Sequence, residues 1–211
     1  MLQEACSAAE HVALQLQRDT GSYAALGARL RSAQPANVLT VARGSSDHAA
    51  NYCAYLIMAR LGRIVASLPM SLVTLYKSPL LTRDALAIAI SQSGQSPDVI
   101  EPIRYFREGG ATTVALVNDA ASPLANSAEW CLPLHAGPEL SVAATKSFIT
   151  SLTAAARLVA HWQGDAEFLA QIEALPAALQ LAAETDWSAA IEVLAPASRI
   201  MVVGRGTSFP V

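Results

Sequence analysis

The chain carries little charge. Only 15% of its 211 residues are Asp, Glu, Lys or Arg, and the formal net charge is -3. Its basic residues form no Lys/Arg cluster, so the concentrated positive field that nucleic acids and anionic membranes require is missing. We therefore expect no nucleic-acid partner and no membrane partner. A small ligand, neutral or locally anionic, fits this composition better.

Cysteines and long apolar runs are also scarce. Cys6, Cys53 and Cys131 form no C-x-x-C pair, and their odd number suits a reducing compartment better than a disulfide framework. No apolar stretch reaches the roughly 18 residues of a membrane span. The first residues show no basic flank followed by a secretory apolar run. We predict a cytoplasmic protein.

Several motifs of nucleotide and catalytic sites are absent. The sequence contains neither G-x-x-x-x-G-K-[ST] nor G-x-S-x-G, and Gly204-Arg205-Gly206 is not followed by the third glycine of a dinucleotide fingerprint. The four histidines show no metal-ligand spacing. These absences argue against a nucleotide site, a serine hydrolase and a metal enzyme, so we expect no metal and no cofactor.

Apolar residues, by contrast, make up 53% of the chain. Short continuous runs of Val, Ile and Leu alternate with longer amphipathic segments, a pattern typical of parallel strands buried on both faces. The pattern predicts an α/β fold with a doubly wound, flavodoxin-like parallel sheet of about five strands. Predicted strands lie near residues 37–42, 63–67, 85–90, 112–117, 129–134 and 199–203. Predicted helices lie near 2–18, 22–33, 47–61, 97–108, 142–162, 165–184 and 187–195.

Hydroxyl groups gather where predicted strands end, which is where such sheets bind ligands. Residues 91–96, Ser-Gln-Ser-Gly-Gln-Ser, follow the third predicted strand and precede Pro97. A helix cap needs one such side chain, supplied here by Ser96, or by Ser46 or Asp47 for the helix after the first strand. The polar side chains beyond the one that a cap needs also favour a phosphate-binding loop at a helix N-terminus. On this loop alone both interpretations stay open.

The sequence contains a short internal repeat. VLTVARGSSD at residues 38–47 returns as IMVVGRGTSF at residues 200–209. In both places a predicted strand precedes Arg, Gly, a hydroxyl residue and Ser, which indicates a duplicated domain. We therefore predict four segments: N-terminal helices at 1–36, a first domain at 37–162, connecting helices at 163–197, and the incomplete beginning of a second domain at 198–211.

Three segments carry a family resemblance. ARGSSDHA, ISQSGQSPD and AGPELSVAATKSF resemble, in order and spacing, the signature segments of the sugar isomerase (SIS) family, above all the isomerase half of glutamine-fructose-6-phosphate aminotransferases. The resemblance implies a hexose 6-phosphate ligand. It assigns the phosphate to Ser46, Ser91, Gln92, Ser93 and Ser96, and places Ser45 and Val142 beside the sugar.

The resemblance also implies an activity. No glutaminase domain precedes the first strand, which favours the aminosugar-phosphate deaminases and isomerases that interconvert glucosamine 6-phosphate with fructose 6-phosphate and ammonia. In that family the proton-moving glutamate and its lysines follow the second Arg-Gly-hydroxyl motif, so we expect the catalytic residues beyond Val211. The alternative is a noncatalytic sugar-phosphate sensor, since the SIS fold also resembles effector domains of transcriptional regulators.

Two residues within the chain are weaker candidates for the site. Lys146 is predicted in the first turns of a helix, where the dipole disfavours a cation, so it either binds an anionic partner or is a solvated surface lysine. Glu139, at a predicted strand exit, either touches the sugar or precedes the helix as a favourable acid. Glu139 is also the first candidate for a base within residues 1–211.

The segment 142–162 is apolar and rich in small residues on more than one face. Such a helix offers more surface than one sheet can cover, so we predict that it packs against a second copy in a homodimer. The alternative is a central helix buried within one domain. In either case Leu152 is expected to lie on a buried face.

Overall fold

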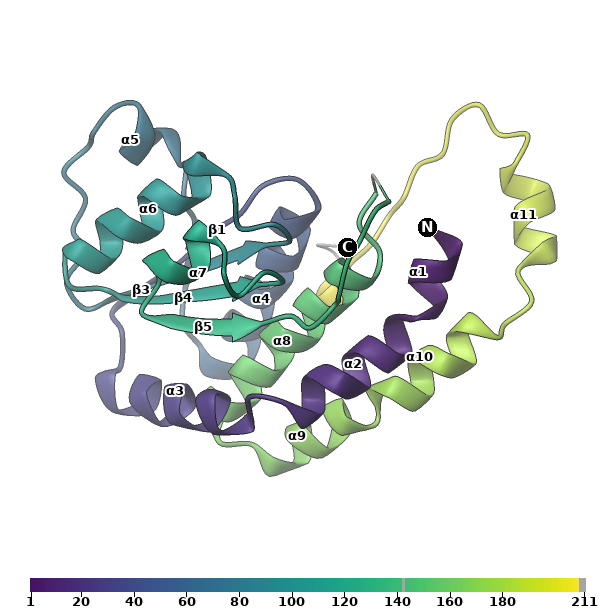
Figure 1. Ribbon diagram of the computed structural model, residues 1–211, viewed down its shortest axis with the longest axis horizontal. Helices are drawn as coiled ribbons and strands as arrows, with labels where there is room; N and C mark the ends of the chain where they lie inside the picture. Colours follow the sequence, from purple (N-terminus) through teal and green to yellow (C-terminus); the bar gives the residue numbers. More distant parts are fainter. Residues whose placement is uncertain (142, 209–211) are drawn as a thin grey trace.

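The computed structural model describes residues 1–141 and 143–208, and its centre is a five-stranded parallel sheet with the order β2-β1-β3-β4-β5 (Figure 1). This is the flavodoxin-like, doubly wound order, so the predicted fold class is confirmed. The strands are β1 (Asn37–Val41), β2 (Val65–Ser67), β3 (Ala85–Ser91), β4 (Thr112–Val117) and β5 (Trp130–Pro133).

Helices cover both faces of this sheet. On one face lie α3 (Thr20–Ala33), α4 (Ser45–Leu61) and α8 (Lys146–Gln163). On the other lie α6 (Pro97–Glu108) and α7 (Pro123–Ser127). The remaining helices are α1 (Leu2–Cys6), α2 (Ala8–Gln17), α5 (Ser71–Thr74), α9 (Ala166–Glu173), α10 (Leu175–Ala183), α11 (Ser188–Leu194) and the short 3-10 helix η1 (Gly206–Ser208).

The sequence of β3, Ala-Leu-Ala-Ile-Ala-Ile-Ser, explains how the two faces differ. Leu86, Ile88 and Ile90 belong to the core beneath α3, α4 and α8, whereas the intervening alanines belong to the core beneath α6 and α7. Successive side chains of a strand point to opposite faces, so one face receives large residues and the other small ones. All six residues from Ala85 to Ile90 are buried. None of the helices among the described residues is long and apolar enough to span a membrane.

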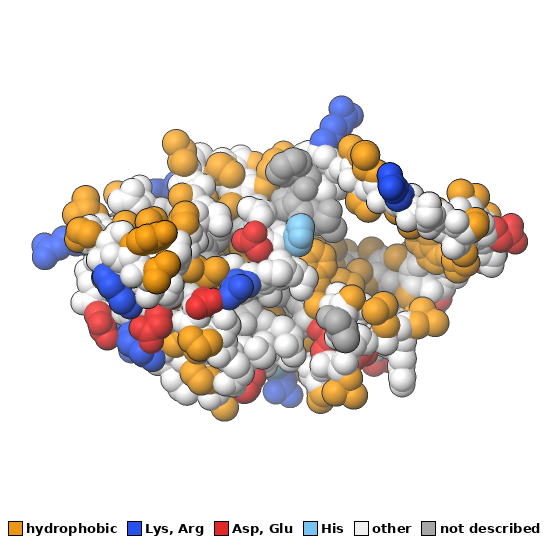
Figure 2. Space-filling model, turned by 90° about the horizontal axis from the view of Figure 1, so that it is seen from above, with side chains coloured by type: hydrophobic (Ala, Val, Ile, Leu, Met, Phe, Trp, Pro, Cys, Tyr) orange, Lys and Arg blue, Asp and Glu red, His pale blue; other side chains and the backbone are white. Residues whose placement is uncertain are grey.

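The prediction of a strand at 199–203 is wrong for this chain. These residues form no ladder, and Ile200, Met201, Val202 and Val203 are 60–87% exposed. A single extended segment has no hydrogen-bonding partners of its own, and no described strand lies beside this one. In Figure 1 α11 stands away from the sheet and the chain after it returns towards α4, against which η1 packs. Hydrophobic side chains gather over the arm formed by α11 and these residues in Figure 2.

Several predicted helix boundaries also differ. The helix expected at 142–162 begins at Lys146, and Val142 lies outside the described residues. The helix expected at 47–61 begins at Ser45, with Gly44 as its N-cap. The helix expected at 165–184 is interrupted at Ala174, where Pro176 lies in the first turn of α10 and cannot supply a backbone donor to continue α9. The helix expected at 2–18 is interrupted at Ser7.

The apolar surplus of α8 is covered within the chain. Helices α2, α3, α4 and α9 pack around it, and most of its residues from Lys146 to Trp162 are buried. Thus α8 is the central helix of one domain, and its composition no longer indicates a second copy. Leu152 is half-buried against the core.

Candidate functional site

A cavity of about 410 Å³ lies at the carboxyl ends of β1 and β3, where the direction of winding reverses. In doubly wound sheets this is the expected place of a ligand crevice. The cavity brings together segments that are far apart in the sequence. Its lining comes from the exit of β1 (residues 43–46), the exit of β3 (90–93 and Ser96), Val99, and the segment after β5 (Glu139, Ser141 and Ala144).

The N-termini of α4 and α6 both face this cavity. The N-cap of α4 is Gly44, whose φ of 59° suits glycine, and the N-cap of α6 is Ser96, followed by Pro97. Gly44 has no side chain with which to cap α4, and the Ser96 side chain makes no hydrogen bond to α6. In contrast, Ser122 caps α7 and Asp165 caps α9 through their side chains. Capping therefore does not account for the hydroxyl groups that line the cavity.

The loop after β3 has a defined conformation that leaves its hydroxyl protons available. The backbone N-H of Gly94 donates to Ser91 Oγ at 3.0 Å, and that of Gln95 donates to Ser93 Oγ at 3.4 Å. Each serine thus accepts a hydrogen bond and retains its own O-H for a ligand. Gly94 is required here, because its φ is 64° and an added Cβ would lie 2.2 Å from Ser122 Oγ.

Glu139 lines the cavity, but its carboxylate is hydrogen-bonded to the start of α8. Its Oε1 accepts hydrogen bonds from the Thr145 N-H at 2.9 Å, the Thr145 hydroxyl at 3.1 Å and the Ser147 N-H at 3.3 Å, and its Oε2 accepts from the Ser147 hydroxyl. Burial alone would raise the pKa of Glu139, yet these hydrogen bonds outweigh it and lower the pKa. An ionised carboxylate so engaged is a weak proton acceptor, which favours the interpretation of Glu139 as an acid that stabilises a helix N-terminus.

The segment that contains Glu139 is hydrogen-bonded to the N-terminal helix α1. Glu4 Oε1 accepts a hydrogen bond from the Leu140 N-H at 2.7 Å, and Glu4 Oε2 accepts one from the Ser141 hydroxyl. These bonds, led by that of Ser141, lower the pKa of Glu4 to about 2. Helix α1 therefore holds one wall of the cavity in place.

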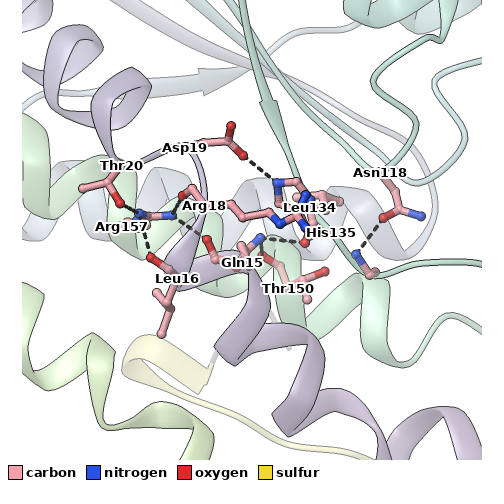
Figure 3. A network of polar contacts seen from close by, with 11 residues as sticks. Gln15, Leu16, Arg18, Asp19, Thr20, Asn118, Leu134, His135, Thr150 and Arg157 are labelled. Atoms are coloured by element: carbon pink, nitrogen blue, oxygen red, sulfur yellow. Dashed lines mark hydrogen bonds and ion pairs between the residues drawn. The ribbon is translucent and has the colours of Figure 1, made fainter.

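A buried polar network holds the exit of β5 (Figure 3). Gln15 of α2 donates from Nε2 to the carbonyls of Leu134 and Thr150, both at 3.0 Å. Arg157 of α8, only 3% exposed, donates to three carbonyls at the end of α2 and to the Thr20 hydroxyl. The last carbonyls of a helix lack the usual helical donors, and Arg157 supplies donors to them, sharing the Gln15 carbonyl with the Arg18 N-H, so that it locks α2 against α8.

The structure brings together most of the residues proposed from the sequence. Lys146 is the first residue of α8, is 6% exposed and does not line the cavity, and its side chain has no hydrogen bond or ion pair with any residue that the structure describes. Most of the Lys146 side chain is therefore buried, in contrast to an ordinary surface lysine. Val142 was expected beside the sugar and lies outside the described residues. The predicted residues that line the cavity are Ser45, Ser46, Ser91, Gln92, Ser93, Ser96 and Glu139.

Sequence reasoning missed Arg43. This residue lines the cavity, and its side chain pairs with Asp98 in the first turn of α6. A signal was present, because arginine precedes glycine in both copies of the repeated motif, at Arg43 and at Arg205.

A larger hollow, of about 830 Å³, lies elsewhere, against the first residues of β1 and the short edge strand β2. Its lining is mainly aliphatic, including Leu39, Ile64 and Leu81. It lies away from the exits of β1 and β3 and lacks the convergent polar groups by which binding sites fix a ligand. The smaller, polar cavity is therefore the candidate site.

Comparisons with known proteins agree with the fold and with the motif segments. Residues 30–160 match the family model of the SIS domain. The chain is 32% identical over 184 residues to the glutamine–fructose-6-phosphate aminotransferase [isomerizing] of Zymomonas mobilis, covering 82% of this chain and 30% of that enzyme. The chain thus spans less than a third of this curated relative.

Solved structures give the same picture. A candidate phosphosugar isomerase from Silicibacter pomeroyi DSS-3 superposes with a TM-score of 0.88 at 42% identity, over 92% of this chain and 61% of the other. The glucosamine-6-phosphate deaminase of Thermotoga maritima gives a TM-score of 0.64 at 21% identity, over 83% and 53%, which shows a shared fold alone.

Proposed function

The chain belongs to the SIS domain family, and on that premise we propose that it binds a hexose 6-phosphate in the cavity between the exits of β1 and β3. The phosphate lies against Ser46 and the Ser91–Ser96 loop, and the sugar lies towards Ser45, Glu139 and the segment that contains Val142. The single observation that carries this proposal is the convergence of hydroxyl-rich strand exits on two helix N-termini without side-chain caps.

The chemistry of the cavity suits a phosphoryl group. A helix N-terminus offers backbone N-H groups and a positive dipole end, and here two of them face one cavity. Serine hydroxyls and the Gln92 amide can donate to the three terminal phosphoryl oxygens. Gly44 has open space where a Cβ would stand, so its backbone leaves room for a ligand.

Calorimetry tests the binding proposal. Fructose 6-phosphate and glucosamine 6-phosphate should bind, whereas fructose should bind far more weakly. Ser93→Ala should weaken phosphosugar binding by about tenfold or more, as expected for one charge-assisted hydrogen bond. Ser127→Ala is the matched control, because the Ser127 hydroxyl donates to the Pro123 carbonyl within α7 and the residue does not line the cavity. Unchanged affinity in Ser93→Ala would remove the loop from the phosphate site.

For the complete protein we propose phosphosugar isomerisation, with deamination of an aminosugar phosphate as the favoured reaction. Proton transfer between C1 and C2 of an open-chain sugar requires a base whose pKa lies near the working pH. Glu139 does not suit this role, since its carboxylate is held by α8 and its pKa is lowered. We therefore place the base outside residues 1–211. The same observation favours, as a second candidate, a noncatalytic sugar-phosphate sensor.

An ammonia-release and isomerisation assay separates these possibilities. Residues 1–211 should bind hexose 6-phosphates yet turn over neither glucosamine 6-phosphate nor fructose 6-phosphate. A chain extended through the second repeat should be active if the protein is an enzyme and inactive if it is a sensor. Turnover by residues 1–211 that is abolished in Glu139→Gln would instead identify Glu139 as the base.

We also propose a homodimer in the cytoplasm. The three cysteines are unpaired, which agrees with a reducing compartment. Exposed hydrophobic residues on the C-terminal arm, such as Trp187 and Ile191, provide surface for association. Light scattering that finds a monomer at micromolar concentration would contradict the dimer.

A further inference from the structure

The cavity has a cation that the sequence analysis did not assign. Among the described residues that line it, Arg43 is the only Lys or Arg, while the others are serines, Gln92, Glu139 and small or apolar residues. A phosphate dianion that enters this cavity therefore meets one side chain of opposite charge. Arg43 directly precedes Gly44, the N-cap of α4, so it stands beside the backbone groups that face the ligand.

Arg43 pairs with Asp98 in the structure. Its Nη1 contacts Asp98 Oδ2, and the two side chains are 59% and 48% exposed. Ion pairs this exposed contribute little, because solvent screens the charges and two long side chains lose freedom. Asp98 has a second stabilising environment, the first turn of α6, where the helix dipole favours a carboxylate. Separating the two residues therefore costs little.

A bound phosphate is the stronger partner for the guanidinium. Arginine presents five N-H donors in a planar fork that matches phosphate oxygens in a bidentate manner, and the contact with Asp98 uses only Nη1. The phosphate is also held by the serines and helix N-termini of the cavity, whereas Asp98 holds Arg43 by one contact at the rim. Binding of the phosphate therefore favours the contact between Arg43 and the phosphate over the contact between Arg43 and Asp98.

Resting on the function proposed above, we propose that Arg43 is a ligand-binding residue that exchanges its partner. When the sugar phosphate binds, the Arg43 guanidinium separates from Asp98 and binds the phosphate group. Asp98 then acts as a competitor for Arg43 in the free protein rather than as part of the phosphate site. The two members of one ion pair should therefore have opposite effects on ligand affinity. A pair that only stabilised the loop would give effects of the same sign.

Calorimetry with fructose 6-phosphate and with inorganic phosphate tests this exchange on residues 1–211. Arg43→Gln should weaken binding of both probes by about tenfold or more, and Arg43→Lys should weaken it less, because charge is kept but the fork is lost. Asp98→Asn should tighten binding by about two- to fivefold, since the competing carboxylate is gone. The double variant should behave like Arg43→Gln.

The same helix supplies a matched control. Arg104 pairs with Glu101 at 2.7 Å on α6, with side chains 50% and 47% exposed, and it does not line the cavity. Arg104→Gln should leave both affinities within about twofold, as expected for an exposed pair. Thermal melting of every variant should match the wild type, because the residues changed are exposed.

The outcomes separate this inference from the proposed function. If the wild type binds fructose 6-phosphate but Arg43→Gln binds it equally well, the exchange is overturned and the phosphosugar site stands. If Arg43→Gln and Asp98→Asn both weaken binding to a similar extent, the pair is merely structural and the exchange is again overturned. If the wild type binds no hexose 6-phosphate at all, the proposed function fails and the inference fails with it.

Discussion

Asp19 and His135 form a pair in which both partners have a left-handed backbone. Asp19 has a φ of 57° and His135 a φ of 55°, and Asp19 Oδ2 lies 2.5 Å from His135 Nε2. Residues other than glycine adopt this conformation at a cost, so surrounding contacts must hold them there. His11 supplies one such contact, through Nδ1 to the His135 carbonyl at 3.0 Å. The pair joins the N-terminal helices to the exit of β5.

Asp19→Ala should lower the free energy of unfolding by about 1.5–3 kcal/mol, because a hydrogen bond to a charged group is lost and alanine tolerates positive φ poorly. Asp19→Asn should cost less, since asparagine adopts the left-handed conformation and can still accept from His135. Urea denaturation measures both changes. Equal losses in the two variants would show that the charge matters more than the backbone conformation.

Gly94→Ala should disrupt the loop after β3. The new methyl group would lie 2.6 Å from Ser122 Cβ and 2.9 Å from Val117 Cγ2, at a φ of 64°. We expect a loss of at least about 2 kcal/mol in stability, together with weaker phosphosugar binding. Gly21→Ala is the control, because nothing lies within 4 Å of its added Cβ and the residue is helical, so stability should rise by up to about 1 kcal/mol.

The core beneath α8 can be tested with two leucines of the same helix. Leu158 is fully buried, and Leu158→Ala should destabilise the protein by about 2–5 kcal/mol through lost burial and a cavity. Leu152 is only half-buried against the core, so Leu152→Ala should cost about 1–2 kcal/mol. Chemical denaturation measures which of the two variants loses more unfolding free energy. A larger loss in Leu152→Ala would mean that the helix presents a different face to the sheet.

Acid should weaken the fold through Glu4. Its pKa is lowered in the folded protein from 4.5 to about 2, chiefly by the Ser141 hydroxyl and the Leu140 N-H. A carboxyl group with a lowered folded pKa contributes stability above its unfolded pKa, and this contribution is lost as pH falls through the folded pKa. The melting temperature of the wild type should therefore fall between pH 4.5 and 2, and Glu4→Gln should show a shallower decline. Parallel curves for the two proteins would contradict the role of Glu4.

Local sequence pattern was enough to predict the elements of the sheet. The central strands β3 and β4 are buried along almost their whole length, and burial of both faces of a parallel sheet produces the near-continuous apolar runs that predicted them. The start of α6 at Pro97 was also predictable, because proline favours the first helical position through its own backbone geometry. The run at 199–203 has the same local pattern but no neighbouring strand, and a strand exists only as part of a ladder.

The roles of individual side chains depended on distant partners. Ser96 and Glu139 each had two interpretations in the sequence, and only the folded chain separates them: Ser96 makes no side-chain cap, whereas Glu139 is engaged by α8. Arg43 and Asp98 are 55 residues apart and meet because β1 and β3 are adjacent in the sheet. Composition suggested that α8 needed a second copy, yet α2, α3, α4 and α9 cover it. Periodicity and turn residues act between near neighbours, whereas burial, hydrogen-bond partners and charge pairs form only when the strand order brings remote segments together.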